Sequence, residues 1–465
     1  MMIKPIRDRL YGRKFFPRGV QPPCRKEFTE REPIGMLIPK QELKVPLIQH
    51  IGAVCDALVK PREEVSFGQK IADADAPISA PIHASVTGKT GMATVAALPN
   101  GLRVPTIPIT PAAEQENVVP ANFLQQYMDR NWDSVEPNSY EPEAICEAIR
   151  EGGVVGLGGA TFPTHFKLKR SPDRPVDTVV LNGCECEPYL TSDHRLMVEA
   201  PEPIVVGLQL AVRAIGAQRA IIAIEHNKPD AIEIMRKVVK DRPNIEVAVC
   251  ATKYPMGGER QLIPAVLGRI VPSAPKGLPL DVGVVMVNVA TAHSIARAVV
   301  RNQPLTHRVV TVTGRGVAQP GNWLVPIGTI FSELIEACGG VTDRALKVLA
   351  GGPMMGPTVP NLNVPVTKGV GGITVMIEEE TVHWKESPCI RCAKCVDFCP
   401  LHLSPTKIAH AVKFRDYFLA NKYDMNACCE CGCCSYICPA NIPLAQYIRA
   451  GKLQWRLIQA QGQKS

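Results

Sequence analysis

Ten of the 17 cysteines in this chain of 465 residues lie in two short runs near the end of the sequence. The first run, CIRCAKCVDFCP, begins at Cys389, and the second, CCECGCCSYICP, begins at Cys428. The first has the spacing C-x2-C-x2-C-x3-C-P, and the second fits this spacing with only one choice of four cysteines. Three closely spaced thiolates bind one iron–sulfur cube, and the fourth binds the neighbouring cube. The runs therefore predict two [4Fe-4S] clusters whose ligands are exchanged between the runs.

This exchange assigns four cysteines to each predicted cluster. The ligands expected for cluster 1 are Cys389, Cys392, Cys395 and Cys438. The ligands expected for cluster 2 are Cys428, Cys431, Cys434 and Cys399. Cys429 and Cys433 fall outside the spacing, so we expect them to pack as small hydrophobic side chains. Zinc is the less favoured alternative, because a zinc site needs four ligands and no proline after the last cysteine.

The rest of the composition is that of a globular protein in a reducing compartment. Hydrophobic residues make up 46% and charged residues 21% of the chain, and the other cysteines are scattered. The N-terminus shows no apolar segment of a signal peptide. The most apolar stretch, from Asp281 to Val300, carries charged side chains and reads as a strand and a helix, not a membrane span. We therefore expect a peripheral protein that is able to dock on a membrane partner.

The net charge of +8 is concentrated at the two ends of the chain. Residues 1–26 hold eight Lys or Arg and one acidic residue, and the segment from Ala440 onward holds four basic residues and no acid. These ends are either ordinary solvated segments or docking sites for an acidic protein or a lipid surface. Nucleic acid is not expected as a partner, because the sequence shows no recognition motif.

The sequence pattern predicts a multidomain chain with α/β and α+β units. We expect a basic arm at 1–30, a β-rich unit at 31–115, and an α/β domain at 116–305, where helical and apolar strand segments alternate. A small α+β unit of the β-grasp (SLBB) type is expected at 306–380, and a helical two-cluster ferredoxin module at 381–465.

Part of the predicted β-rich unit resembles a known carrier domain. Residues 59–90 are similar to the hammerhead, or barrel-sandwich hybrid, of biotinyl and lipoyl carriers. Those carriers have an attachment lysine at a hairpin tip, but the corresponding tip here reads ADADAP. We therefore expect the fold without the carrier function.

A glycine-rich loop, EGGVVGLGGATFPTHFKLKR, is the second pattern that could do chemistry. It contains four glycines within 153–159 and then Lys167. Glycines let backbone amides approach a phosphate closely, and a lysine adds a positive charge. The loop lacks the G-K-S/T of a Walker motif, and an ordinary turn is the alternative interpretation.

Within this loop, GLGGATFPTHFK resembles the flavin loop of the NADH-binding subunit of respiratory complex I and of related NAD-linked hydrogenases and formate dehydrogenases. Three further segments resemble loops of that family in the same order: LNGCECEPYLTSDHR, YPMGGERQLI and VNVATA. Each follows a predicted strand, where parallel sheets bind their ligands. The resemblance implies a Rossmann-like domain with non-covalent FMN that exchanges hydride with NAD(H).

Carried over by position, the resemblance also implies individual binding residues. Those implied for FMN are Gly156, Gly158, Gly159, Lys167, Asn182, Cys184, Glu185, Asn288 and Thr291. Those implied for NADH are Phe162, Glu187 and Glu259. The alternatives are ordinary loop carboxylates at Glu187 and Glu259, and buried, inert thiols at Cys184 and Cys186. No catalytic acid or base is expected, because hydride transfer needs none.

The sequence departs from the complex I pattern at three positions. Leu157 stands where that family has an arginine, Cys184 replaces an acid, and Gly258 replaces the first of two glutamates. These departures imply a different flavin potential and a different fit to NADH. The single-cluster motif of that family is also replaced by the two cysteine runs.

Over nearly its whole length the chain resembles the C subunit of the Rnf ion-translocating ferredoxin:NAD oxidoreductase complex. The segments FPRGVQPPCRKE and TSDHRLM carry this resemblance beyond the flavin loops. It implies integral membrane and ferredoxin-type subunits as partners, ferredoxin or flavodoxin as an indirect one, and a peripheral position on the cytoplasmic face of the plasma (inner) membrane. The alternatives are a soluble flavin and iron–sulfur reductase, such as a microcompartment cobalamin reductase, and a flavin-free electron relay.

Overall fold

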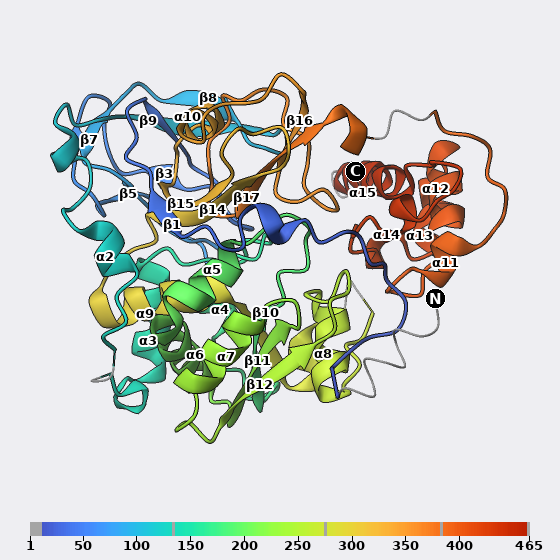
Figure 1. Ribbon diagram of the computed structural model, residues 1–465, viewed down its shortest axis with the longest axis horizontal. Helices are drawn as coiled ribbons and strands as arrows, with labels where there is room; N and C mark the ends of the chain where they lie inside the picture. Colours follow the sequence, from blue (N-terminus) through green and yellow to red (C-terminus); the bar gives the residue numbers. More distant parts are fainter. Residues whose placement is uncertain (1–11, 133–134, 274–276, 382–384, 463–465) are drawn as a thin grey trace.

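The computed structural model describes residues 12–132, 135–273, 277–381 and 385–462. An α/β unit lies at the bottom of Figure 1, two β-rich units lie above it, and the C-terminal helical module lies to the right. No helix among the described residues is both long and apolar enough to cross a bilayer.

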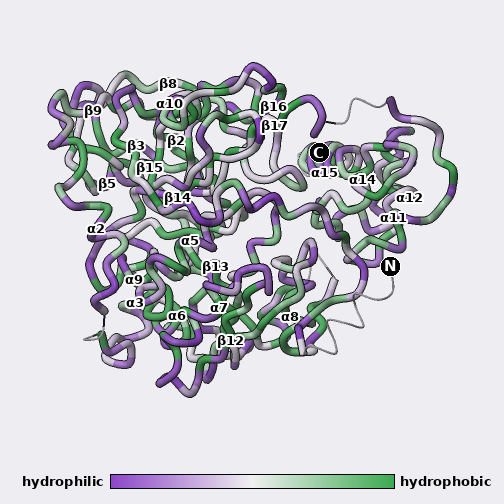
Figure 2. Tube along the Cα trace, viewed as in Figure 1, coloured by the Kyte–Doolittle hydropathy of each residue, from purple (hydrophilic) through white to green (hydrophobic). Residues whose placement is uncertain are grey.

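A four-stranded parallel sheet forms the centre of the α/β unit. Its strands are β10 (Thr178–Gly183), β11 (Arg219–Glu225), β12 (Ile245–Cys250) and β13 (Val284–Asn288), in the order β12-β11-β10-β13. Nearly every residue of β10 and β11 is buried because helices cover both faces. Figure 2 shows hydrophobic residues along these strands and hydrophilic residues on the outer loops. The predicted α/β domain with a parallel sheet is confirmed.

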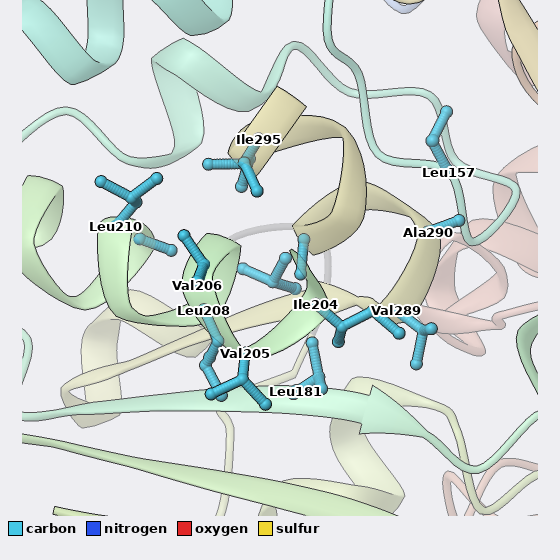
Figure 3. Packing of buried hydrophobic residues seen from close by; sticks show 14 of the residues in the cluster. Leu157, Leu181, Ile204, Val205, Val206, Leu208, Leu210, Val289, Ala290 and Ile295 are labelled. Atoms are coloured by element: carbon cyan, nitrogen blue, oxygen red, sulfur yellow. The ribbon is translucent and has the colours of Figure 1, made fainter. Parts of the chain in front are cut away.

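Seven helices accompany this sheet: α3 (Pro142–Glu151), α4 (Thr164–Lys167), α5 (Ser192–Glu199), α6 (Pro201–Ile215), α7 (Pro229–Val238), α8 (Glu259–Leu267) and α9 (Val289–Arg301). Side chains of α6 and α9 interlock with Leu181 of β10 to form the core (Figure 3). The two helices touch at Gly207, where an added Cβ would lie 1.8 Å from the carbonyl oxygen of Ala292. This contact fixes α9, whose first residues border the site described below.

The second unit along the chain, which follows the N-terminal segment, consists of two small sheets around one apolar core. One sheet has the order β2-β9-β7-β4 with β8 paired to β9, and the other has the order β3-β5-β6. The strands are β2 (Leu43–Pro46), β3 (Asp56–Ala57), β4 (Glu64–Val65), β5 (Lys70–Asp73), β6 (Ile82–His83), β7 (Gly88–Thr90), β8 (Thr94–Ala97) and β9 (Arg103–Pro111). A short helix, α2 (Phe123–Tyr127), follows this unit.

The fourth unit along the chain follows the N-terminal segment, the second unit and the α/β unit. It is a five-stranded sheet in the order β1-β15-β14-β17-β16, packed against α10 (Phe331–Ala337). Four of its strands come from one segment: β14 (His307–Thr313), β15 (Gly321–Pro326), β16 (Ala345–Ala350) and β17 (Gly372–Ile377). The fifth, β1 (Ile34–Met36), pairs in parallel with β15, so that Ile34 lies opposite Asn322. The range 31–115 was expected to form one β-rich unit, but the structure places 34–36 in this other sheet.

The C-terminal module is helical, as predicted. Its helices are α11 (Lys394–Asp397), α12 (Pro405–Lys413), α13 (Tyr417–Lys422), α14 (Cys433–Tyr436) and α15 (Leu444–Gly462). Helix α15 packs along α12, and residues such as Ile408 and Ile448 form a small core between them.

The basic N-terminal segment packs against the α/β unit. The amide of Lys14 donates to the carbonyl of Val249 at 2.9 Å, and the amide of Ala251 donates to the carbonyl of Lys14 at 2.8 Å. Phe16 and Lys26 are 3% and 4% exposed. Residues 14–26 are therefore not a solvated arm, docking to a partner stays a prediction, and residues 1–11 lie outside the described part.

Candidate functional site

The α/β sheet has its topological switch point between β10 and β13. From β10 the chain builds β11 and β12 on one side, and it returns to place β13 on the other side. Asn182 and Asn288 are register partners at the carboxyl ends of these two strands. Open α/β sheets bind their ligands in the crevice at this point.

The glycine-rich loop is held directly over this crevice. The hydroxyl of Thr291 accepts a hydrogen bond from the amide of Leu157 at 2.8 Å. A Cβ added to Gly158 would lie 3.3 Å from the Cβ of Asn288, so a larger side chain there would push the loop away. The structure therefore brings together the glycines, Asn288 and Thr291, as the resemblance implied.

The tip of this loop has the donors that a phosphate needs. Within the described ranges, the amides of Gly158, Gly159 and Ala160 make no hydrogen bond to the protein. Gly159 has φ +107° with open space around it, a conformation that glycine adopts without strain. Helix α9 begins next to the loop, with the side chain of Asn288 capping its first turn at 3.3 Å. Unpaired amides and a helix N-terminus favour an anion, so the site fits the phosphate of FMN.

Two charged residues that the sequence did not single out, the partly buried Asp193 and the buried Arg308, support this loop. Asn288 donates to the Asp193 carboxylate at 2.6 Å, and Arg308 donates to the carbonyl of Leu157 at 3.1 Å. Burial lowers the pKa of Arg308, which the nearby Asp193 carboxylate opposes. Arg308 belongs to β14, so the fourth unit contributes directly to the flavin loop.

The loop after β10 contains three residues implied for cofactor binding. The Glu185 carboxylate accepts hydrogen bonds from the amides of Asp193 at 2.8 Å and His194 at 3.2 Å, and so caps α5. Burial raises its pKa to about 7. Cys184 lies fully buried with Cys250 in an apolar cluster, and burial raises the pKa of its thiol. Glu187 accepts from the amides of Met354 at 3.2 Å and Met355 at 2.9 Å, and burial raises its pKa to about 7.

The other implied residues lie at the rim of the crevice. Lys167 and Glu259 form a partly exposed ion pair, with 3.1 Å between Nζ and Oε1. The Asn182 side chain donates to the carbonyl of Gly257 at 2.9 Å and so holds the loop before α8. Phe162 stacks edge-on against the ring of Phe166. The roles predicted for these residues in binding FMN or NADH stay predictions.

Three buried lysines, none of them predicted as site residues, stabilise the loops around the crevice. Lys26 donates to the carbonyls of Glu185 at 2.9 Å and Glu187 at 3.1 Å. Lys228 donates to the carbonyl of Cys184 at 2.6 Å. Lys368 donates to the carbonyls of Gly153 at 2.7 Å and Pro81 at 2.8 Å, and burial lowers its pKa to about 7.

A second site lies in the helical module. The four cysteines assigned to cluster 2 line one hollow, whose open volume, including the part facing solvent, is about 370 Å³. Its wall includes Cys399 from the first run and Cys428, Cys431 and Cys434 from the second. The thiol lining and the exchange of ligands between runs fit a cluster.

The cysteines assigned to cluster 1 form a separate, more open group. Burial and then the nearby thiols of Cys438 and Cys389 raise the pKa of Cys395. Cys389 and Cys392 are exposed, and Cys395 is partly buried. Among the described residues, no three His, Cys, Asp or Glu side chains converge as ligands of a single metal ion.

The two cysteines outside the spacing differ from each other. Cys433 is fully buried, packed with Val20 and Tyr254, as predicted. Cys429 is exposed, so the prediction that it packs as a small hydrophobic side chain is wrong, although both cysteines line the hollow. Both cysteines simply fall outside the spacing of the second run, so the sequence did not predict this difference in burial.

Comparison with protein families agrees with both sites. The Nuo51 FMN-binding domain matches residues 149–297, the RnfC barrel sandwich hybrid domain 14–114, the SLBB domain 309–358 and a 4Fe-4S dicluster domain 388–443. These matches confirm the predicted domain types and define the chain as a flavin and iron–sulfur protein.

Three relatives identify the family, and each is the C subunit of a complex. The C subunit of the Na(+)-translocating ferredoxin:NAD(+) oxidoreductase complex of Acetobacterium woodii is 40% identical to this chain. The match covers 85% of this chain and 86% of the relative. The relative from the proton-translocating complex of Clostridium ljungdahlii is also 40% identical, over 85% and 84%. The relative from the ion-translocating oxidoreductase complex of Rhodobacter capsulatus is 39% identical, over 93% and 82%. The chain therefore belongs to the family of C subunits of ion-translocating ferredoxin:NAD oxidoreductase complexes.

Among solved structures, an NAD+-reducing [NiFe]-hydrogenase in the air-oxidized state is similar, with a TM-score of 0.47 and 23% identity. The match covers 65% of this chain and 57% of that one.

Proposed function

We propose that this chain is the NAD(H)-linked subunit of an ion-translocating ferredoxin:NAD oxidoreductase, with one FMN and two [4Fe-4S] clusters. One arrangement carries the proposal: the glycine loop and the start of α9 face each other at the switch point of the sheet, and the hollow lined by four cysteines borders the same domain. The matches to an FMN-binding domain and to the relatives in ion-translocating complexes favour it over a flavin-free relay or a soluble cobalamin reductase.

In this function the residues of the chain bind and orient the groups. Bound FMN would supply the exchange between a hydride and single electrons. The amides of Gly158 and Gly159, with the start of α9, hold its phosphate. Thr291 and Arg308 keep the loop in place, because they bond its amide and its carbonyl at Leu157. Glu187, in the loop after β10, and Glu259, at the rim, bind the dinucleotide, and Asn182 fixes the loop before α8.

We further propose the partners and the location. The relatives' names describe multi-subunit ion-translocating complexes, so we assign this chain to such a complex as a peripheral subunit. Its partners are integral membrane and ferredoxin-type subunits on the cytoplasmic face of the plasma membrane, and ferredoxin or flavodoxin reaches it indirectly. Ion movement belongs to the partners, with which this chain exchanges electrons.

The test uses the full chain purified without oxygen. Denaturation should release about one FMN per chain, and NADH should bleach the flavin absorbance and then the cluster absorbance. Clusters without flavin would establish the relay alternative instead. Sedimentation with membranes at low salt, and release at high salt, is expected for the peripheral subunit. A protein that stays in the supernatant at low salt while other subunits are present would contradict the proposed location.

A further inference from the structure

The segment 14–26 lies where the α/β unit meets the helical module (Figure 1), and it contacts both. At its start it adds to the edge of the α/β sheet through Lys14. Phe16 inserts into the apolar cluster of that unit, and Lys253 donates to its carbonyl at 3.1 Å. At its end, Lys26 holds the loop after β10. Both ends of the segment are therefore attached to the flavin domain.

Between these ends the segment forms hydrogen bonds to the helical module. The guanidinium of Arg18 donates to the carbonyl of Val396 at 2.9 Å, and the amide of Gly19 donates to the carbonyl of Phe398 at 3.1 Å. Phe398 immediately precedes Cys399, a predicted ligand of cluster 2, and Val396 lies three residues before it. Gly19 has φ +70°, and an added Cβ would lie 2.5 Å from the carbonyl oxygen of Tyr254. Only glycine permits this close approach.

The same place joins Tyr254 to a second predicted ligand of cluster 2. Val20 and Tyr254 exchange two backbone hydrogen bonds of 2.9 and 3.0 Å. The Tyr254 hydroxyl donates to the carbonyl of Cys431 at 2.8 Å, and both side chains are buried with Val20. Gln261 of α8 adds a buried bond of 3.3 Å to the carbonyl of Pro400. The flavin domain thus contacts the cluster 2 side of the module through Tyr254 and Gln261.

We propose that residues 14–26 act as a strap that fixes the cluster 2 site against the flavin domain, and that Arg18 is a positioning residue for electron transfer between them. This inference rests on the proposed function. Oxidation of one NADH to NAD+ releases two electrons and one proton. The two electrons would cross this junction to clusters held by the cysteines, one electron to each, and the proton would leave to solvent. The strap would then hold the cysteines assigned to cluster 2 next to the flavin domain.

The first experiment separates flavin reduction from cluster reduction. Full-length protein loaded with FMN and clusters is mixed with NADH in a stopped-flow spectrometer without oxygen. In Arg18→Ala, flavin bleaching should keep the wild-type rate, and cluster bleaching should slow by about tenfold or more, because small misplacements of reacting groups have large effects on rate. Arg18→Lys, which keeps a donor, should recover part of the rate. Arg31→Ala, which removes an exposed arginine shortly after the strap, should match the wild type.

The second experiment measures the exchange of backbone amides in the strap, in the absence of NADH turnover. Hydrogen–deuterium exchange should be faster in Arg18→Ala at the amide of Gly19, which bonds to the helical module, and at those of Val20 and Tyr254, which join the strap to the flavin domain. Exchange should be unchanged in Arg31→Ala. Unchanged exchange together with unchanged cluster bleaching would overturn the strap. A wild-type flavin that NADH does not bleach would instead refute the proposed function, and the exchange experiment would still decide on the strap.

Discussion

At the scale of single residues, the flavin loop depends on one side-chain acceptor. Thr291 is buried, and its hydroxyl accepts the amide hydrogen of Leu157. The substitution Thr291→Val keeps the shape but leaves this buried amide without a partner, at a cost of about 1–3 kcal/mol. We expect FMN to bind on the order of tenfold more weakly, measured by fluorescence titration of the apoprotein.

A matched control exists for this substitution. Thr329 is also fully buried, and its hydroxyl has no hydrogen-bond partner among the described residues. Thr329→Val should therefore leave FMN affinity and stability unchanged. Equal FMN affinities in Thr291→Val and Thr329→Val would show that the hydroxyl does not support the loop.

The second residue-scale prediction concerns pH. Burial raises the pKa of Glu187 to about 7 in the folded protein, above its ordinary value in the unfolded chain. Between about pH 4.5 and pH 7 the folded state therefore binds more protons at this group than the unfolded state, so the free energy of unfolding falls as pH rises. Above pH 7 this contribution levels off.

The substitution Glu187→Gln removes this titration and keeps one acceptor oxygen, which serves only one of the amides of Met354 and Met355. Denaturant unfolding at a series of pH values should show the wild type losing stability relative to the variant between about pH 4.5 and pH 7. Parallel stability profiles over that range would mean that Glu187 does not titrate with a raised pKa.

Residue chemistry was predictable here where it follows a local spacing. The cysteine spacing grouped four residues that line one hollow, and the glycine loop was found next to Asn288 and Thr291. The buried residues Lys26, Lys228 and Lys368 were not predicted, because each donates to main-chain carbonyls. A carbonyl is present at every residue, so such partners leave no pattern in the sequence.

At the scale of elements, the two cysteine runs depend on each other, because Cys399 lies before α12 and its predicted fellow ligands lie around α14. Cys399→Ser should lower the iron content of anaerobically purified protein by about half and weaken one of the two cluster signals in electron paramagnetic resonance. Cys433→Ser removes a thiol of the second run outside the spacing and should leave the iron content unchanged. Equal iron loss in both variants would contradict the ligand assignment.

The elements themselves were predictable from hydrophobic pattern. The parallel sheet followed from alternating helical and apolar strand segments, and the helical module from the cysteine spacing. The pattern did not show that Ile34–Met36 leaves its neighbours and pairs with β15. Three extended residues favour any strand partner equally, and only the completed sheet selects one.

At the scale of the whole molecule, the flavin domain is stabilised by residues of other units. Lys368 lies between β16 and β17 of the fourth unit, and it donates to the carbonyls of Pro81 in the second unit and Gly153 in the flavin domain. Lys368→Met leaves these two carbonyls without their donor, so we expect a loss of about 2 kcal/mol in the free energy of unfolding, measured with urea, and weaker FMN binding.

Lys44→Met is the control for this prediction. The ammonium of Lys44, like that of Lys368, donates a hydrogen bond to another part of the chain. Its acceptor is the Asn363 side chain at 2.6 Å, and the bond is exposed to solvent. Its loss should change stability by less than about 0.5 kcal/mol. Equal losses in the two variants would show that Lys368 does not link the units.

The pairing of β1 with β15 also has a consequence for synthesis of the chain on the ribosome. Ile34 must wait for Asn322 before its strand can pair. At a synthesis rate of about 5–20 residues per second, this delay is roughly 15 to 60 seconds. During that time the first strand made has no edge to join, so the segment after the strap is exposed to chaperones and proteases. The beginning of the chain is thus among the last parts to take its final position.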